Sequence, residues 1–322
     1  MNDLEYAFAA AYIKTIANKM LTRKDLEQLM GFGTAEEAIK FLKDRGYGGK
    51  SDGDGRLERL LQRELETAWQ EAYSVLPEGA PVDILLYQND FHNLKTVLKA
   101  MMSNAAWEEL VIRPCIVEPQ ELYDAAVTAD FGGLPEFIRD TAEQAYERIT
   151  SSNDGQLTEL LIDKQAFAVM RKRAGDNRFL AGWVELNIFL ANLKTAVRGA
   201  YTGKTAQFLA GAMLPSEQIQ AERLAAAAAE GIDAVLALIE AGGYAAAAER
   251  ARESMSAFEK WCDNQRMEYL KDYKNNSFGV EPILAFLIGK QSEIQAVRMI
   301  VSGKENRIPE ELIRERLREL YV

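Results

Sequence analysis

The side chains that most often perform chemistry are scarce in this sequence. Its 322 residues include one histidine, His92, and two cysteines, Cys115 and Cys262. Ser-His-Asp or Cys-His catalysis, and any metal site with two histidines, would all depend on His92. That histidine directly precedes an apolar-periodic run, a position typical of a polar residue in the first turn of a helix. Two cysteines are too few for a structural zinc site or a secreted disulfide framework. We therefore predict no catalytic residues and no metal site.

Two kinds of glycine-rich segment match ligand-binding loops only in part. A phosphate-binding loop needs a glycine five positions before Gly-Lys-Ser/Thr, and the segments that begin at Gly49 and Gly203 both lack it. Residues 52–55 begin like a calcium loop, but Leu57 stands at the glycine position and Arg63 at the position of the bidentate glutamate. We interpret all three segments as turns and expect no nucleotide hydrolysis and no cofactor.

Charge and hydropathy exclude further classes of protein. The chain has 49 Asp and Glu against 38 Lys and Arg, a formal charge of −11. Nucleic-acid binding needs many basic side chains to replace phosphate counterions, so we expect no nucleic-acid partner. The first residues carry acids where a signal peptide carries bases, and the apolar runs fall short of the about 18 residues that a membrane span needs. We expect a soluble protein of a reducing compartment.

The elements that would position these side chains are helices almost throughout. Apolar residues recur at helical spacing, and Ser/Thr-x-x-acid signatures at Thr22 and Thr34 mark helix starts. The strand-like stretch at 111–117 is interrupted by Pro114, and Gly46–Gly55 is expected to be a loop. The fold class is therefore predicted to be all-α. The expected helices cover 4–18, the segment after Thr22, 34–46, 56–75, 83–102, 119–129, 135–150, 155–175, 178–203, 215–228, 231–240, 243–274, 280–289, 291–302 and 309–320.

One pattern recurs along the chain. Asn93-Leu-Lys-Thr returns as Asn192-Leu-Lys-Thr 99 residues later, and a weaker copy starts at Ala296, a further 104 residues on. Asp90 and Glu293 each precede their copy by three positions. A long amphipathic helix is expected before each copy. We interpret Asp90 and Asn93 as structural caps of the repeated helices.

A period near 100 residues is longer than that of an ordinary solenoid. It predicts three similar helical domains, 1–112, 113–210 and 211–322, around a pseudo-threefold axis. Chance similarity between helices of an all-helical chain is the alternative.

Several motifs follow one another in a characteristic order and spacing. They are Tyr6 to Lys14, Met20 to Asp25, Asp90 to Lys99, Ile162 to Phe167, Pro282 to Phe286, Lys290 to Ile300, Gly303-Lys304 and Ile313 to Val322. Over the whole chain they resemble the C subunit of the bacterial and archaeal V/A-type rotary ATPase, the equivalent of the d subunit of the vacuolar enzyme. The departures, Lys14 for an arginine, Ala296 for an asparagine and Phe189 in the second repeat, remove no defining residue.

The resemblance implies three similar domains that form a funnel. Its wide end would rest on the cytoplasmic surface of the rotor ring of c/K/L-type proteolipid subunits, and its cavity would receive the D–F shaft of the central stalk. The protein would be a non-catalytic monomer within the complex, peripheral to the membrane through the ring, and would carry torque for ion transport without a cofactor. A soluble helical-repeat scaffold for protein partners is the alternative, and an enzyme with a carboxylate pair or lysine pocket is a more distant one.

A repeated set of basic residues offers a candidate contact with the ring. Because they recur in the pattern, these side chains would project similarly from the three domains. The alternative is a solvated face or pairing within a domain, for example of Asp90 with Lys95. The set comprises Lys95, Lys99, Lys194, Arg198 and Arg298.

Overall fold

A computed structural model describes residues 6–49, 56–152, 155–273, 276 and 278–321 of the chain. The predicted all-α class is confirmed, since helices and turns account for these ranges and no strand occurs within them. The chain forms two compact units, Met1–Ala80 with Arg252–Val322, and Pro81–Ala251. The predicted boundaries at 112/113 and 210/211 remain a prediction. The calcium-like segment at 52–55 and most of the first Gly-Lys-Ser segment lie outside the described residues.

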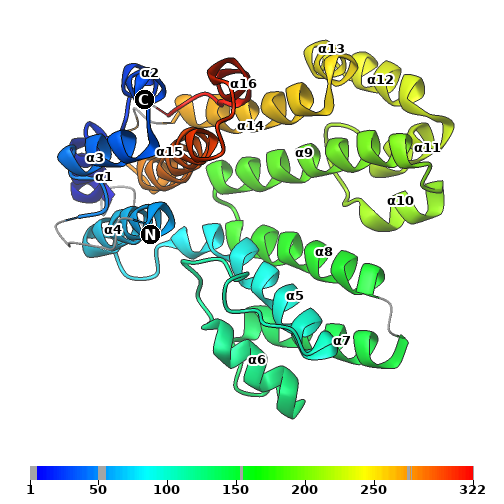
Figure 1. The fold of residues 1–322 in the computed structure, drawn as a ribbon. Helices are drawn as coiled ribbons and strands as arrows, with labels where there is room; N and C mark the ends of the chain where they lie inside the picture. The colour runs from blue at the N-terminus through cyan, green and yellow to red at the C-terminus, as the bar shows by residue number, and fades with distance from the viewer. Residues whose placement is uncertain (1–5, 50–55, 153–154, 274–275, 277, 322) are drawn as a thin grey trace. The chain divides into compact units, whose positions relative to one another are not determined.

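The first unit joins the two ends of the chain around one core (Figure 1). Helix α15 packs against all four N-terminal helices, and α16 packs against α14 and α15. Leu29, Leu61 and Ile300 are fully buried in the shared core. The helices are α1 (Ala7–Ala17), α2 (Arg23–Gly31), α3 (Ala35–Asp44), α4 (Leu57–Val75), α14 (Met255–Lys271), α15 (Glu281–Glu305) and α16 (Glu310–Arg316).

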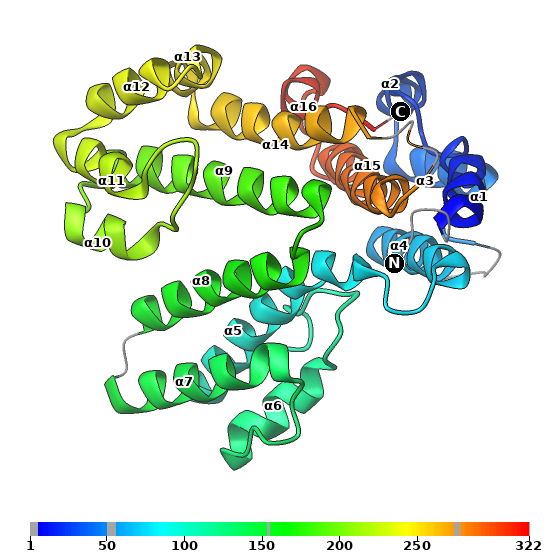
Figure 2. The ribbon, with the colours of Figure 1, turned by 180° about the vertical axis from the view of Figure 1, so that it is seen from behind.

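The second unit packs consecutive helices against one another. Helix α5 lies against α6, α7 and α8, while α9 lies against α8, α10, α11 and α12, as the view from behind also shows (Figure 2). Its helices are η2 (Pro81–Leu85, a 3-10 helix), α5 (Tyr87–Ser103), α6 (Pro119–Thr128), α7 (Glu136–Ser152), α8 (Gly155–Ala174), α9 (Arg178–Thr202), α10 (Ala206–Ala212), α11 (Ala221–Glu230), α12 (Ile232–Ala241) and α13 (Ala245–Glu253).

Both predicted capping boxes are present. The Thr22 and Thr34 hydroxyls accept hydrogen bonds from the backbone N–H groups of Asp25 and Glu37, and those two carboxylates accept the threonine N–H groups in return. Each box satisfies two backbone donors that the first turn of a helix leaves unpaired, so the sequence signature marks both starts correctly.

Several expected helix limits are wrong; the helix predicted at 215–228, for example, begins only at Ala221, as α11. The helix predicted at 243–274 ends at Glu253 and restarts at Met255, because the Ser254 hydroxyl caps the new helix by accepting the Ala257 N–H. The helices predicted at 280–289 and 291–302 are one continuous helix, α15. Helix α10 has no counterpart among the predicted elements, and residues 111–117 form an irregular connector.

Candidate functional site

The three repeat copies lie on α5, α9 and α15, here called the anchor helices. Asn93 on α5 is fully buried; its amide nitrogen donates to the Ile112 carbonyl at 3.0 Å, and its oxygen accepts the Ile112 N–H at 2.7 Å. Asn192 on α9 repeats this clamp with Leu214, at 2.6 and 3.0 Å. Each amide therefore satisfies both backbone groups of one residue in a connector further along the chain, Ile112 between α5 and α6 and Leu214 between α10 and α11.

On α5 and α15, a carboxylate three positions before the asparagine position also binds backbone, by accepting N–H groups. Asp90 Oδ1 accepts the Ile116 and Val117 N–H groups at 2.9 and 2.8 Å. Glu293 Oε2 on α15 accepts the Leu21 N–H at 2.6 Å, across 272 residues of sequence. Both carboxylates are fully buried. The repeat signature Asp90, Asn93, Asn192 and Glu293 therefore has a structural role, but not the capping role that we expected for its first two members. Leu86 is the N-cap of α5, and no side chain caps that position.

The Asp90 carboxyl lies in an environment that disfavours its charge. Burial raises its pKa to about 7, although the two N–H groups on Oδ1 act to lower it. Its second oxygen, Oδ2, is buried and has no hydrogen-bond partner among the described residues. Burial also raises the pKa of the nearby Cys115 thiol to about 11, with a further contribution from the Asp90 carboxylate.

The third anchor helix carries an ion network inside the first unit. The Lys290 ammonium lies 2.8 Å from Glu293 Oε1 and 2.9 Å from Glu64 Oε1, and Glu64 Oε2 accepts the Gly48 N–H. Burial acts to lower the pKa of Lys290, but the two carboxylates outweigh it and the pKa is raised. The ammonium also lies over the Tyr47 ring, 5.4 Å from its centre. The network joins α4 and α15 to the turn after α3.

Three of the five repeated basic residues form ion pairs with acidic residues of their own unit. Lys95 pairs with Asp163 at 2.6 Å and Lys99 with Glu159 at 2.6 Å, so both join α5 to α8. The expected pairing of Lys95 with Asp90 is wrong, since Asp90 serves the backbone instead.

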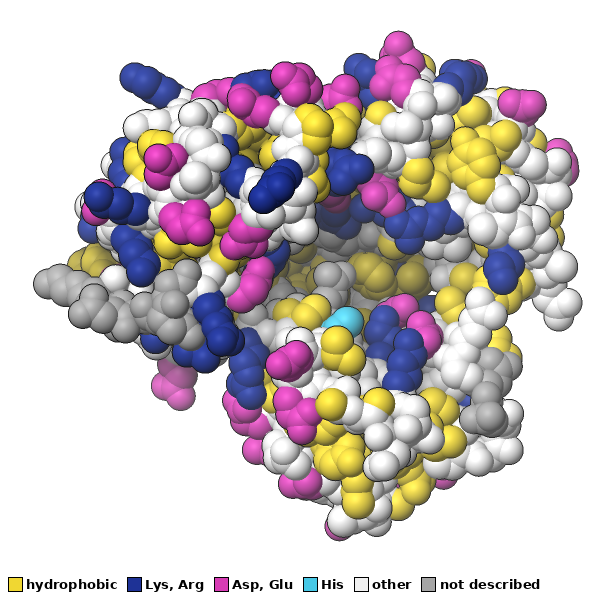
Figure 3. Space-filling view, in the orientation of Figure 1, with side chains coloured by type: hydrophobic (Ala, Val, Ile, Leu, Met, Phe, Trp, Pro, Cys, Tyr) yellow, Lys and Arg dark blue, Asp and Glu magenta, His cyan; other side chains and the backbone are white. Residues whose placement is uncertain are grey.

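The remaining members of the basic set lie on the other two anchor helices. Arg298 makes a two-bond contact with Glu58 of α4, at 2.9 Å for both Nε and Nη2. On α9, Lys194 is half-buried and Arg198 is exposed. Acidic and basic side chains are interspersed on the face seen in Figure 3. Whether this set also contacts a partner remains a prediction.

His92 lies in the second turn of α5, with Nε2 3.3 Å from the Leu110 carbonyl oxygen. Within the described ranges, no three His, Cys, Asp or Glu side chains gather as a metal site. Over the same residues, no helix is both long and apolar enough to cross a bilayer.

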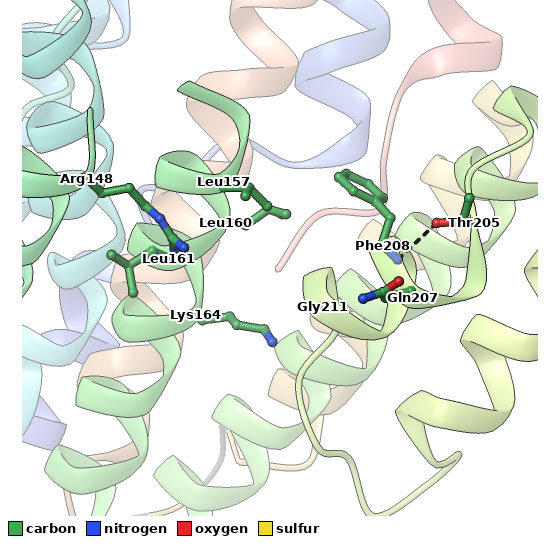
Figure 4. A pocket seen from close by; sticks show the side chains of 9 residues that line it. All are labelled: Arg148, Leu157, Leu160, Leu161, Lys164, Thr205, Gln207, Phe208 and Gly211. Atoms are coloured by element: carbon green, nitrogen blue, oxygen red, sulfur yellow. Dashed lines mark hydrogen bonds between the residues drawn. The ribbon is translucent and has the colours of Figure 1, made fainter. Parts of the chain in front are cut away.

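A groove between α8 and α10 is a feature that periodicity did not indicate. It has a volume of about 500 Å³ and is lined by both helices and by the end of α7 (Figure 4). Sequence reasoning missed it because α10 was not expected. The sequence of α8 did contain an indication of the groove. Three leucines of this helix, Leu157, Leu160 and Leu161, lie outside its buried face.

The buried polar side chains of the anchor helices bind the chain's own backbone. This arrangement is typical of a helical protein with a structural role. The comparison with known families defines it further: the family described as ATP synthase (C/AC39) subunit matches residues 9–316. The chain belongs to that family, as its motifs predict. It is a non-catalytic accessory subunit of a rotary ATPase complex.

Curated relatives cover nearly the whole chain. The C subunit of the V-type sodium ATPase of Enterococcus hirae is 24% identical over 99% of this chain and 99% of its own. The C subunit of the A-type ATP synthase of Methanocaldococcus jannaschii is 26% identical over 95% of this chain and 85% of its own. The C subunit of the V-type ATP synthase of Thermus thermophilus is 23% identical over 92% of each chain.

Proposed function

We propose that this chain lies on the cytoplasmic side of the membrane and couples the rotor ring of proteolipid subunits to the D–F shaft of the central stalk. The observation that carries the proposal is the family match over residues 9–316, together with a C subunit from a V-type enzyme that aligns along its full length. In this proposal the chain forms three similar domains arranged as a funnel. The matching clamps of Asn93 and Asn192 support the similarity of the first two domains.

A rotary coupling has to resist deformation. Close helix packing supplies low compressibility, and satisfied buried polar networks fix one arrangement of the elements. The anchor helices combine both features, because each buries an apolar face and fastens backbone through a fully buried amide or carboxylate. This construction suits a part that transmits torque.

The basic set is proposed to contribute to attachment to the ring. Three of its members have acidic partners inside their unit, so their replacement by glutamate would add repulsion within the fold. Replacement by glutamine removes the charge with less disturbance. Single exposed ion pairs contribute only about 0–1 kcal/mol, so we expect an effect only when several bases are changed together. The test variant changes Lys95, Lys99, Lys194, Arg198 and Arg298 to Gln.

A matched control breaks the same three ion pairs from the acidic side. It carries Asp163→Asn, Glu159→Gln and Glu58→Gln and leaves every base in place. The measurement is the fraction of chain that sediments with ring-containing membranes over a salt series, with circular dichroism to follow folding. We expect wild-type attachment to weaken as salt shortens the ~10 Å screening length.

We expect the glutamine variant to lose attachment and the acidic-side control to keep it. Equal loss in both variants would give the bases a purely structural role. A wild-type chain that stays in the supernatant with intact rings present would overturn the coupling function itself and favour a scaffold for other partners.

A further inference from the structure

Helix α8 has apolar residues on more than one side. One stripe, which includes Ile162 and Met170, is buried against its neighbours. A second stripe, Leu157, Leu160 and Leu161, follows the i, i+3, i+4 spacing of a helix face and is only partly covered, with Leu157 40% exposed. Apolar faces of a helix are normally covered by other parts of a protein or by a partner. The second stripe is an apolar surface that the described residues cover only in part.

Across from this stripe, α10 completes a groove. Its Phe208 faces the leucines of α8, and Thr205, Gln207 and Gly211 complete the same wall (Figure 4). The volume of about 500 Å³ falls within the range of about 300–1,000 Å³ that is typical of ligand sites. The groove face of α8 runs from Leu157 to Lys164, about 10 Å at 1.5 Å per residue, so it spans roughly two helical turns.

Among the described residues that line the groove, the two charged side chains are both positive. Arg148 from α7 and Lys164 from α8 line it, and no Asp or Glu is among its described lining residues. A third cation, Lys204, lies 5.0 Å from the centre of the Phe208 ring. The acids of α8 are directed elsewhere, since Glu159 and Asp163 pair with lysines of α5. This one-sided charge stands out in a chain of net charge −11.

We propose that the α8–α10 groove binds an amphipathic helix, from another protein of the complex, that carries Asp or Glu beside its apolar face. Apolar residues at i, i+3 and i+4 of that helix would meet Phe208 and the three leucines. Its carboxylates would pair with Arg148 and Lys164, because charge-assisted hydrogen bonds to carboxylate are strong and directional. The proposal rests on the proposed function, which places this chain among partner proteins.

The first test maps the groove in the assembled complex. Gln207 is exposed at the rim, so Gln207→p-benzoylphenylalanine introduces a photoreactive group without disturbing the core. Tyr201, 58% exposed in the same unit and outside the groove lining, carries the same group as a control. We expect irradiation to join position 207, but not 201, to a helical peptide of another protein of the complex with Asp or Glu next to its apolar positions. A product with lipid, with a second copy of this chain or with a non-acidic segment would overturn the proposal, as would no product from an incorporated chain.

The second test measures the charge contribution directly. The cross-linked segment is synthesised with a fluorescent label and titrated with the full chain. Arg148→Glu combined with Lys164→Glu should weaken binding at least about tenfold, and so should a rise from about 50 to about 500 mM salt. The matched control, Lys40→Glu with Lys43→Glu on exposed positions of α3, changes the net charge equally and should bind like wild type. Equal affinity of all three chains would refute the proposed ion pairs.

The experiments distinguish a failure of the coupling function from a failure of the groove proposal. If the wild-type chain does not enter the complex, the coupling function is wrong. If it enters and position 207 meets no acidic helix, only the groove proposal is wrong.

Discussion

Replacing Asp90 by asparagine tests whether this buried carboxyl makes stability depend on pH. The pKa of Asp90 is about 7 in the folded chain, against an ordinary value of 3.8. Between these values the folded chain keeps the proton while the unfolded chain has lost it. Stability is therefore highest below about pH 4 as far as this group is concerned, and the free energy of unfolding falls as pH rises towards 7.

The magnitude follows from the two pKa values. The full loss amounts to roughly 4 kcal/mol, and about 2 kcal/mol of it falls between about pH 5.5 and 8. In the Asp90→Asn variant this loss is absent. The amide oxygen can still accept the Ile116 and Val117 N–H groups, but the NH₂ group takes the place of Oδ2, which has no partner among the described residues. An unpaired buried donor costs about 1–3 kcal/mol. We therefore expect the difference in stability between the two chains to shift by about 2 kcal/mol in favour of the variant between about pH 5.5 and about pH 8.

The assay is urea unfolding followed by circular dichroism at four values between about pH 5.5 and about pH 8. Asp163→Asn is the matched control, because its carboxylate is 53% exposed and only pairs with Lys95. That control should differ from wild type by no more than about 1 kcal/mol at every pH. Arg113 and Glu118, which flank the segment held by Asp90, pair with each other at 2.7 Å, and neither is changed in the two variants. Parallel pH profiles for wild type and Asp90→Asn would refute the reasoning, since the pH dependence would then come from other groups.

Three further substitutions test the fasteners and the packing by urea unfolding. Asn192→Ala should cost about 2–4 kcal/mol, because it leaves both buried backbone groups of Leu214 unpaired; a loss below about 1 kcal/mol would mean that water replaces the amide. Lys290→Met should cost about 3–5 kcal/mol by leaving the buried Glu293 carboxylate and the half-buried Glu64 carboxylate without their cation, and Lys290→Arg should recover part of the loss. Gly289→Ala would place a Cβ 2.6 Å from the Tyr321 side chain and should cost about 1–3 kcal/mol, whereas unchanged stability would mean that the C-terminal segment moves aside freely.

Apolar spacing and capping signatures predicted most helices correctly. They did not predict which residues of distant helices contact one another. Thr22 and Thr34 are found correctly because a capping box is completed within four residues. The helices predicted at 280–289 and 291–302 leave out Lys290, which lies inside α15. It is buried there, and Glu64 from α4 compensates its charge. Helix α10 has seven residues, too few for an apolar stripe to emerge.

For the candidate site, too, the sequence identified the residues but not their contacts. Spacing alone singled out Asn93, Asn192, Asp90 and Glu293, because a repeat is visible without any structure. The capping role expected for Asp90 and Asn93 was wrong, because a cap is a local contact, whereas the four side chains bind backbone between 19 and 272 residues away. The same limit applies to Lys95, whose partner on α8 is 68 residues distant.

The third repeat differs from the first two, because it has no asparagine to bind a connector. An amide both donates and accepts, so Asn93 and Asn192 can each satisfy the N–H and the C=O of one connector residue. On α15 the asparagine position is Ala296, and Glu293, which can only accept when ionised, holds a single N–H, that of Leu21. Leu21 comes from the other end of the chain, so the third anchor helix joins the C-terminal part of the first unit to its N-terminal part. In the proposed coupling role, a bond between the two ends of the chain would help the first unit to resist torque, because neither end could then detach independently.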